Sequence, residues 1–233
     1  PVGQSFVSNT YSRVVNYSDN QLSALVWMRP VHYQGARWHL LGSFREKYEN
    51  AMLPLGKAVG SFGLSPNALS VLAALVSLAA AWLYANGAAI LGALVLLVSA
   101  FLDMLDGSVA RATGKASRFG AVLDHVLDRY VEYILVIGIV AGGFADWFWG
   151  TFALIGMLLA SYARAAAESV GGLKSCTVGI AERQEKLLIV LVGSTLVGVW
   201  ASALQYAVIL VGLLSHITVG QRLLYAWHST KGR

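Results

Sequence analysis

The sequence has few charged residues and almost no cysteine. Lysine, arginine, aspartate and glutamate make up 12% of its 233 residues, which is about half the share found in soluble domains. This composition excludes an ordinary soluble protein. The single cysteine, Cys176, excludes an internal disulfide. We expect it to be a small buried or loop residue and not a nucleophile, because nothing in the sequence favours its thiolate.

The N-terminal region lacks both a signal peptide and a helical pattern. Its first 35 residues are polar and irregular, without the apolar core of a cleavable signal. We therefore expect the first membrane span to act as its own insertion signal. Residues 1–42 are predicted to form a polar extension, either a tail or the remnant of a fused domain.

Long apolar runs dominate the remainder, and 57% of all residues are hydrophobic. Runs of about 20 apolar residues match the hydrocarbon core of a bilayer. We predict six transmembrane helices, at 67–86, 88–108, 119–143, 147–168, 184–200 and 202–225. Residues 43–233 would then form one all-α integral membrane domain.

The segment 43–60 is predicted to be an amphipathic helix lying in the membrane interface before the first span. Ser43 and Glu46 form a capping box, which satisfies free backbone N–H groups at a helix start. Apolar side chains then recur near one face, at Phe44, Tyr48, Met52, Leu55 and Val59. Packing of this helix on a soluble domain is the alternative.

Basic residues are absent from one side of the predicted bundle. The turns at 85–89, 141–147 and 199–204 contain no lysine or arginine, whereas the opposite loops and both termini are basic. This asymmetry predicts a multi-pass protein of the cell membrane with both termini and the active site in the cytoplasm. The net charge of +5 then reflects contact with anionic head groups of membrane lipids. No interleaving of aromatic and basic residues indicates nucleic acid as a partner.

Four aspartates interrupt two strongly apolar stretches. Asp103 and Asp106 are three residues apart, and Asp124 and Asp128 are four apart, so each pair shares a helix face. A short basic hairpin near 110–118 should bring the two faces together near the cytoplasmic surface. An uncompensated charge at the bilayer centre costs about 2.5–3.5 kcal/mol on insertion scales. Four such carboxylates therefore need a compensating partner.

A divalent cation is the partner that the pattern favours. Carboxylate oxygens are hard ligands that suit Mg²⁺ or Mn²⁺, and four of them could hold one or two ions. Zinc is disfavoured, because the lone cysteine and scattered histidines offer no tetrahedral set. Ion pairing with Arg111, Arg118 and Arg129 is the structural alternative.

Small residues beside the aspartates suggest that a ligand lies between the two helices. Gly107 and Gly120 flank the carboxylates, and glycine inside a helix is costly unless something approaches the backbone closely. The small side chain of Ala110 leaves room for a ligand on the same helix face, and the Arg111 guanidinium can bind phosphate. Metal, small residues and arginine together suit a substrate that carries a diphosphate.

The spacing of these residues resembles the signature of the CDP-alcohol phosphotransferases. The matching run is Asp103-x-x-Asp106-Gly107-x-x-Ala110-Arg111, followed after eight residues by Gly120-x-x-x-Asp124-x-x-x-Asp128. The resemblance covers roughly residues 43–225. It implies transfer of a phosphate-alcohol moiety from a CDP-linked alcohol to an acceptor hydroxyl, with release of CMP. It also implies that the four aspartates bind metal, that Asp128 is the catalytic base, and that the protein is a homodimer. The implied CDP-binding residues are Asn67, Gly107, Ala110, Arg111 and Gly120.

A second stretch, 161–186, bears on the acceptor. Its basic residues suit an anionic acceptor such as a polyol phosphate. The stretch is similar to the branch that transfers to inositol phosphate, which implies that Arg164, Arg183 and Lys186 hold the acceptor's phosphate. Ala166 stands where that branch commonly has arginine. Glycerol-3-phosphate as acceptor and CDP-inositol as donor therefore remain alternatives, and a cation transporter is the alternative of another class.

Overall fold

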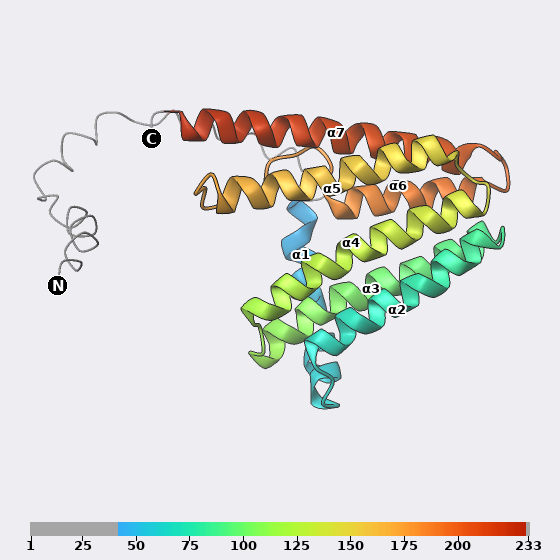
Figure 1. The fold of residues 1–233 in the computed structure, drawn as a ribbon. Helices are drawn as coiled ribbons and strands as arrows, with labels where there is room; N and C mark the ends of the chain where they lie inside the picture. The colour runs from blue at the N-terminus through green and yellow to red at the C-terminus, as the bar shows by residue number, and fades with distance from the viewer. Residues whose placement is uncertain (1–41, 232–233) are drawn as a thin grey trace, which may run out of the picture. The chain divides into compact units, whose positions relative to one another are not determined.

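The computed structural model describes residues 42–231, and side-chain environments from residue 51 onward. This part of the chain consists of helices joined by short connections and contains no strand. The helices are α1 (Gly42–Ser61), α2 (Pro66–Ala85), α3 (Ala89–Thr113), α4 (Arg118–Ala141), α5 (Trp147–Ser169), α6 (Arg183–Leu196) and α7 (Ala203–Thr230) (Figure 1). The all-α prediction is confirmed for these residues. The predicted extension at 1–42 lies outside the described residues, except for residue 42. The side chains of the predicted capping box also lie outside the described part.

Each predicted span coincides with one helix, from α2 to α7, but only four are long and apolar enough to cross a membrane on their own: α2, α3, α5 and α7. α4 carries the charged residues Asp124, Asp128 and Arg129 in its first half and Glu132 just beyond it. α6 has 14 residues and is about 21 Å long at the α-helical rise, less than the roughly 30 Å hydrocarbon core. It ends at Leu196, before the predicted end at 200. A six-span count therefore stays a prediction.

Polar caps fix where two of the site-bearing helices begin. The Ser65 hydroxyl accepts a hydrogen bond from the Ala68 N–H at 3.2 Å, and Pro66 occupies the first turn of α2. The Ser117 hydroxyl accepts one from the Gly120 N–H at 2.9 Å at the start of α4. Both caps satisfy backbone donors that have no partner within the helix. They set the register of α2 and α4, which pack against each other.

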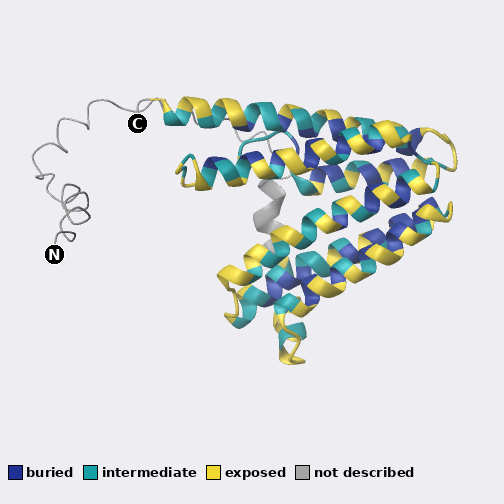
Figure 2. Ribbon diagram, viewed as in Figure 1, coloured by how far each residue is buried: buried dark blue, intermediate teal, exposed yellow. Residues whose placement is uncertain are grey.

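Small residues let α2 and α4 approach each other closely. A Cβ on Gly138 would lie 2.4 Å from the Ala81 carbonyl oxygen. The core of the bundle then fills with side chains from many helices, including Tyr84, Leu96, Ile139 and Leu204 (Figure 2). The Tyr84 hydroxyl and Ser194 Oγ are 2.7 Å apart, which links α2 to α6. α5 and α6 each pack against α7.

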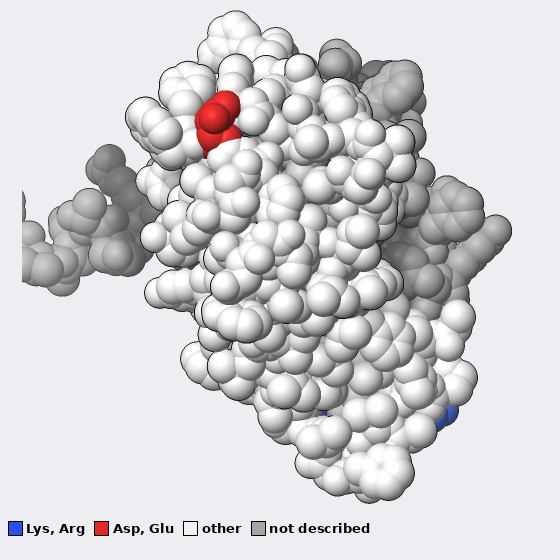
Figure 3. Space-filling model, turned by 90° about the vertical axis from the view of Figure 1, so that its right-hand side faces the viewer, with Lys and Arg blue, Asp and Glu red and all other residues white. Residues whose placement is uncertain are grey.

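The outward faces of the bundle are apolar. Large hydrophobic side chains such as Trp82, Leu94 and Trp147 are more than half exposed, and the face in Figure 3 shows almost no charged atoms. A surface of this kind is compatible with lipid and not with water. Together with the four long apolar helices, it identifies a multi-pass membrane protein.

α1 runs crosswise to the other helices and packs on α3 (Figure 1). The contact is close, because a Cβ on Gly56 would lie 2.7 Å from the backbone of Ser108. Within 51–61, Lys57 and Ala58 are exposed and Met52 and Val59 pack toward Leu105 and Val109 of α3. α1 therefore covers the end of α3 that follows the aspartates. Its location in the membrane interface remains a prediction.

Candidate active site

The hairpin between α3 and α4 brings three of the four aspartates together. Gly114 ends α3 in the left-handed conformation, with φ 67°, which glycine adopts without strain. Ser117 then restarts the chain as α4. One carboxylate oxygen from each of Asp103, Asp106 and Asp124 lies within 4.8 Å of the other two. The predicted convergence is therefore confirmed for these three residues, and their oxygen-only donor set fits Mg²⁺ or Mn²⁺.

Asp128 lies one turn further along α4 and is joined to the cluster by an arginine. Arg183 Nη1 donates a hydrogen bond to Asp103 Oδ2 at 2.6 Å, and the same nitrogen lies 2.6 Å from Asp128 Oδ1. The guanidinium thus neutralises one carboxylate from each helix. Arg183 comes from α6, and the resemblance predicts that it holds the acceptor's phosphate. In the structure its guanidinium contacts Asp103 and Asp128 and also lines a cavity together with Arg164 and Lys186.

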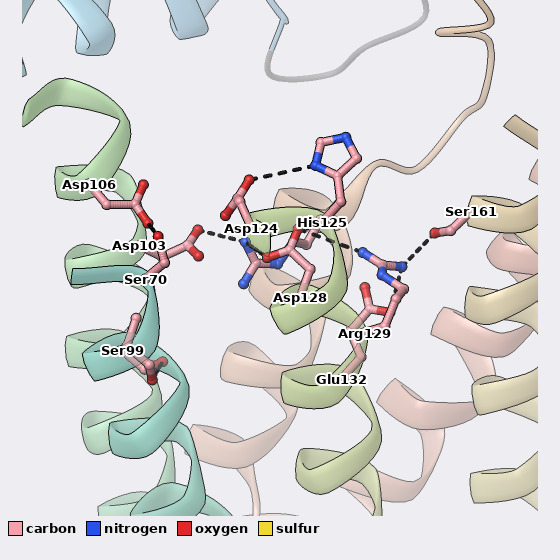
Figure 4. Close-up of polar contacts among 12 residues, drawn as sticks. Ser70, Ser99, Asp103, Asp106, Asp124, His125, Asp128, Arg129, Glu132 and Ser161 are labelled. Carbon is pink, nitrogen blue, oxygen red and sulfur yellow. Dashed lines mark hydrogen bonds and ion pairs between the residues drawn. The ribbon is translucent and has the colours of Figure 1, made fainter. Parts of the chain in front are cut away.

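A serine on α2 fixes the most deeply buried aspartate. The Ser70 hydroxyl donates a hydrogen bond to Asp106 Oδ2, and both residues are 7% exposed (Figure 4). Sequence reasoning missed Ser70. The available signal was its place one helical turn after Asn67, on the helix that packs against α3.

Substituting Ser70 with alanine should weaken divalent-cation binding about 10-fold. A hydrogen bond to a ligating carboxylate orients that ligand, and its loss commonly costs 10–100-fold in metal affinity, roughly. The measurement is Mn²⁺ titration of the purified protein by electron paramagnetic resonance. Ser99→Ala is the matched control, because Ser99 is equally buried between α3 and α2 but donates to the Ala73 carbonyl. Equal Mn²⁺ affinity of the two variants would contradict this role.

The aspartates line a large cavity of about 1050 Å³. All three residues that we predicted for the acceptor's phosphate, Arg164, Arg183 and Lys186, line the same cavity from α5 and α6. The predicted acceptor and metal residues are therefore neighbours in space. Ala166, whose identity left the acceptor open, is not among the lining residues.

The predicted CDP-binding residues are divided between two places. Gly107 and Arg111 line the cavity, and the Arg111 Nη2 atom donates to Ser108 Oγ at 3.4 Å. Asn67 and Gly120 are not among the lining residues but lie against each other, since a Cβ on Gly120 would be 3.0 Å from Asn67 Oδ1. Ala110 is partly buried on α3 and does not line the cavity. The close packing expected at Gly120 is present, and the nucleotide role of these residues stays a prediction.

Several further polar residues of the cavity were missed. Glu132 follows Asp124 and Asp128 at the same four-residue spacing, a signal that the sequence did offer. Arg222 of α7 is buried and donates to the carbonyl oxygens of Val178 at 2.9 Å and Ala160 at 2.5 Å. In the sequence it is one of the basic residues near the C-terminus, which predict only orientation. No local pattern reveals that it turns inward.

Cys176 lies in the connection between α5 and α6 and is fully buried, as predicted. Burial raises the pKa of its thiol, which disfavours the nucleophilic thiolate. Its backbone N–H donates to Glu168 Oε1 at 2.9 Å, and that carboxylate also accepts from Arg164 Nε at 3.1 Å. The connection is thereby tied to Arg164, which lines the cavity from α5.

Comparison with known proteins identifies the family. Residues 63–226 match the family model described as CDP-alcohol phosphatidyltransferase. The chain belongs to this family. An archaetidylinositol phosphate synthase of Pyrococcus horikoshii is 38% identical over 184 residues, covering 79% of this chain and 95% of the relative. One from Methanothermobacter thermautotrophicus is 38% identical over 195 residues, covering 82% and 96%.

Solved structures agree with the sequence relatives. The crystal structure of Mycobacterium tuberculosis phosphatidylinositol phosphate synthase with CDP-DAG bound has a TM-score of 0.70 and 31% identity, covering 78% of this chain and 97% of the other. Its complex with manganese and citrate has a TM-score of 0.71 and 31% identity, covering 78% and 92%. The resemblance seen in the aspartate motif is confirmed, and this CDP-alcohol phosphatidyltransferase is an enzyme of the transferase class.

Proposed function

We propose that this CDP-alcohol phosphatidyltransferase moves the phosphate-alcohol moiety of a CDP-linked lipid alcohol to a hydroxyl of inositol-1-phosphate. CMP is released. The observation that carries the proposal is the single cavity lined by the four aspartates and by Arg164, Arg183 and Lys186. The names of the relatives, which include archaetidylinositol and phosphatidylinositol phosphate synthases, support an inositol phosphate as acceptor.

Asp103, Asp106 and Asp124 would hold the divalent cation, Mg²⁺ or Mn²⁺, as one or two ions, with Asp128 completing the set. When bound, the metal neutralises negative charge on the diphosphate and on the departing CMP. The spacing of the three carboxylate oxygens within 4.8 Å supports this assignment. Ser70 orients Asp106 within the set.

Asp128 would act as the base that takes the proton from the acceptor hydroxyl. The hydroxyl oxygen forms a bond to the phosphorus that carries the lipid alcohol, and the bond from that phosphorus to the oxygen retained by CMP breaks. Arg183 holds Asp128 through the 2.6 Å contact between Nη1 and Oδ1, so the carboxylate is fixed before the acceptor arrives. A positioned base of this kind typically contributes about 10²–10⁴-fold to the rate.

The acceptor's phosphate would bind Arg164 and Lys186, with Arg183 between it and the carboxylates. Guanidinium groups bind phosphate oxygens through directed, charge-assisted hydrogen bonds.

The donor's lipid tails would stay beside the apolar outer faces of the bundle. The basic residues of the α3–α4 hairpin, Lys115 and Arg118, support a cytoplasmic active site with both termini on the same side. A homodimer is proposed from the family resemblance alone.

The test is a transfer assay with purified protein in detergent or liposomes. It contains Mg²⁺, CDP-diacylglycerol or its ether-lipid counterpart, and radiolabelled inositol-1-phosphate. We expect CMP release with label entering the lipid phase, and a kcat/KM at least about 10-fold above that for glycerol-3-phosphate, because unpaired polar groups penalise the wrong acceptor.

Two other outcomes would correct the proposal at different levels. Preference for glycerol-3-phosphate, or label that stays in water when CDP-inositol is the donor, would replace the substrates and keep the reaction. Absence of CMP release with every pair, from protein that still binds Mn²⁺, would overturn the enzymatic assignment and favour a cation-handling role.

A further inference from the structure

A buried ion pair on α4 has no part in the proposed chemistry. Arg129 Nη1 lies 2.7 Å from Glu132 Oε2 and donates a hydrogen bond to Ser161 Oγ of α5 at 2.6 Å (Figure 4). Arg129 and Glu132 both line the active-site cavity. Their side chains are 24% and 11% exposed, respectively. The pair therefore lies within the wall of the site and not on the solvated surface.

Arg129 does not form a close ion pair with the neighbouring Asp128. Its Nη2 atom is 3.8 Å from Asp128 Oδ2, although charge-assisted bonds between arginine and carboxylate close to about 2.7–2.9 Å when nothing opposes them. Both side chains are largely buried, and attraction between opposite charges strengthens where water is excluded. Adjacent residues on a helix point about 100° apart, so Arg129 reaches Asp128 only by bending round the helix, and its other contacts decide whether it does.

Glu132 and Ser161 supply those contacts. Both act on Nη1, the end of the guanidinium that points toward α5, whereas Nη2 faces Asp128. Glu132 contributes a full negative charge and Ser161 only a hydroxyl, so Glu132 is the stronger of the two. Lys186 lines the same two cavities as Glu132.

We propose that Glu132 is a positioning residue that holds the Arg129 guanidinium on Ser161 and so prevents it from closing onto Asp128. The inference rests on the proposed function, which assigns Asp128 to the metal set and to proton acceptance. Without Glu132, Arg129 would pair with Asp128 and compete with the cation and with the acceptor's proton for the same oxygens. The consequence is specific: Glu132 matters only while Arg129 is present.

A double-mutant cycle tests this dependence. The four proteins are the full chain, Glu132→Gln, Arg129→Gln and the double variant, each purified in detergent and titrated with Mn²⁺ by electron paramagnetic resonance. We expect Glu132→Gln to weaken Mn²⁺ binding about 10-fold, the scale of losses around metal ligands. Arg129→Gln and the double variant should bind Mn²⁺ equally well, and both should bind it more tightly than Glu132→Gln. The kcat for CMP release should change in parallel: it should fall in Glu132→Gln and return in the double variant to the value of Arg129→Gln.

Two results would overturn the proposal: unchanged Mn²⁺ affinity in Glu132→Gln, or a double variant as weak as Glu132→Gln. A purely structural clamp between α4 and α5 gives the second result, because removing Arg129 cannot restore a lost helix contact. If Glu132→Gln does not fold, Ser161→Ala removes the weaker restraint. Ser161→Ala should reduce Mn²⁺ affinity by a smaller factor than Glu132→Gln, and only when Arg129 is present. An unchanged affinity in Ser161→Ala would also overturn the proposal.

Asp128→Asn separates this proposal from the proposed function. If that variant binds Mn²⁺ as tightly as the unaltered protein and retains its activity, the assignment of Asp128 fails, whatever the cycle shows. If Asp128→Asn loses both and the cycle shows no rescue, the proposed function holds and the role given to Glu132 is wrong.

Discussion

Asp128→Asn should lower kcat for CMP release by about 10²–10⁴-fold, the usual contribution of a positioned general base. Asparagine has the same shape but no basic oxygen, so it cannot take the acceptor's proton. The substitution also removes the charge that faces Arg183 Nη1 at 2.6 Å and one proposed metal ligand. Initial rates at saturating donor, acceptor and Mg²⁺ measure the effect.

Asp146→Asn is the matched control for this substitution. Asp146 precedes α5 at the opposite end of the bundle, is exposed, and accepts a hydrogen bond from Gln205 at 3.0 Å. Its neutral variant should retain the rate within about 3-fold, because surface substitutions away from special features usually have small effects. A kcat for Asp128→Asn close to that of this control would show that another group accepts the proton.

The motif predicted the carboxylate cluster because its information is local. Asp103 and Asp106 share a face of one helix, Asp124 and Asp128 share a face of the next, and the connection between the helices is short. Few arrangements of two such neighbouring helices keep the faces apart. The spacing of Glu132 belongs to the same series, and following it one more turn would have predicted the third carboxylate of α4.

The contacts that complete the site arise from tertiary packing. Arg183 reaches Asp103 from a helix 80 residues later in the chain, and Arg222 turns inward from α7 to the backbone of α5. In the sequence, the resemblance predicts Arg183 as an acceptor residue, and Arg222 falls within a predicted span near the basic C-terminus. Only the packing of α6 and α7 shows that Arg183 contacts the aspartates and that Arg222 is buried.

The two helices that fail as independent membrane spans are also explained by the site. α4 carries Asp124 and Asp128, which we propose for metal binding and proton acceptance, in its first half, so its continuous apolar length is reduced. α6 is short, yet Glu185 and Lys186 in its first turn are buried against the other helices. Hydropathy over about 20 residues could not separate a helix that contacts lipid from one that lines a polar cavity.

Gly138→Ala should lower the thermal unfolding midpoint in detergent by about 5–10 °C, from a loss of about 2–3 kcal/mol by overpacking. The added Cβ would lie 2.4 Å from the Ala81 oxygen, 2.8 Å from its Cα and 2.9 Å from its carbonyl carbon. These are backbone atoms of α2, which cannot turn aside as a side chain can. The two helices must therefore separate, as close helix contacts in membrane proteins depend on small residues.

Gly220→Ala provides the control, because a Cβ at that position of α7 meets no atom within 4 Å. Alanine is the better helix former, so the control should match or slightly exceed the original midpoint. A Gly138→Ala protein that unfolds at the same temperature as Gly220→Ala would contradict the close approach of α2 and α4. Since α2 carries Ser70 and α4 carries Asp124, separation of these helices should also weaken Mn²⁺ binding in Gly138→Ala alone. Packing of small residues remote from the aspartates would then be a condition for the metal site itself.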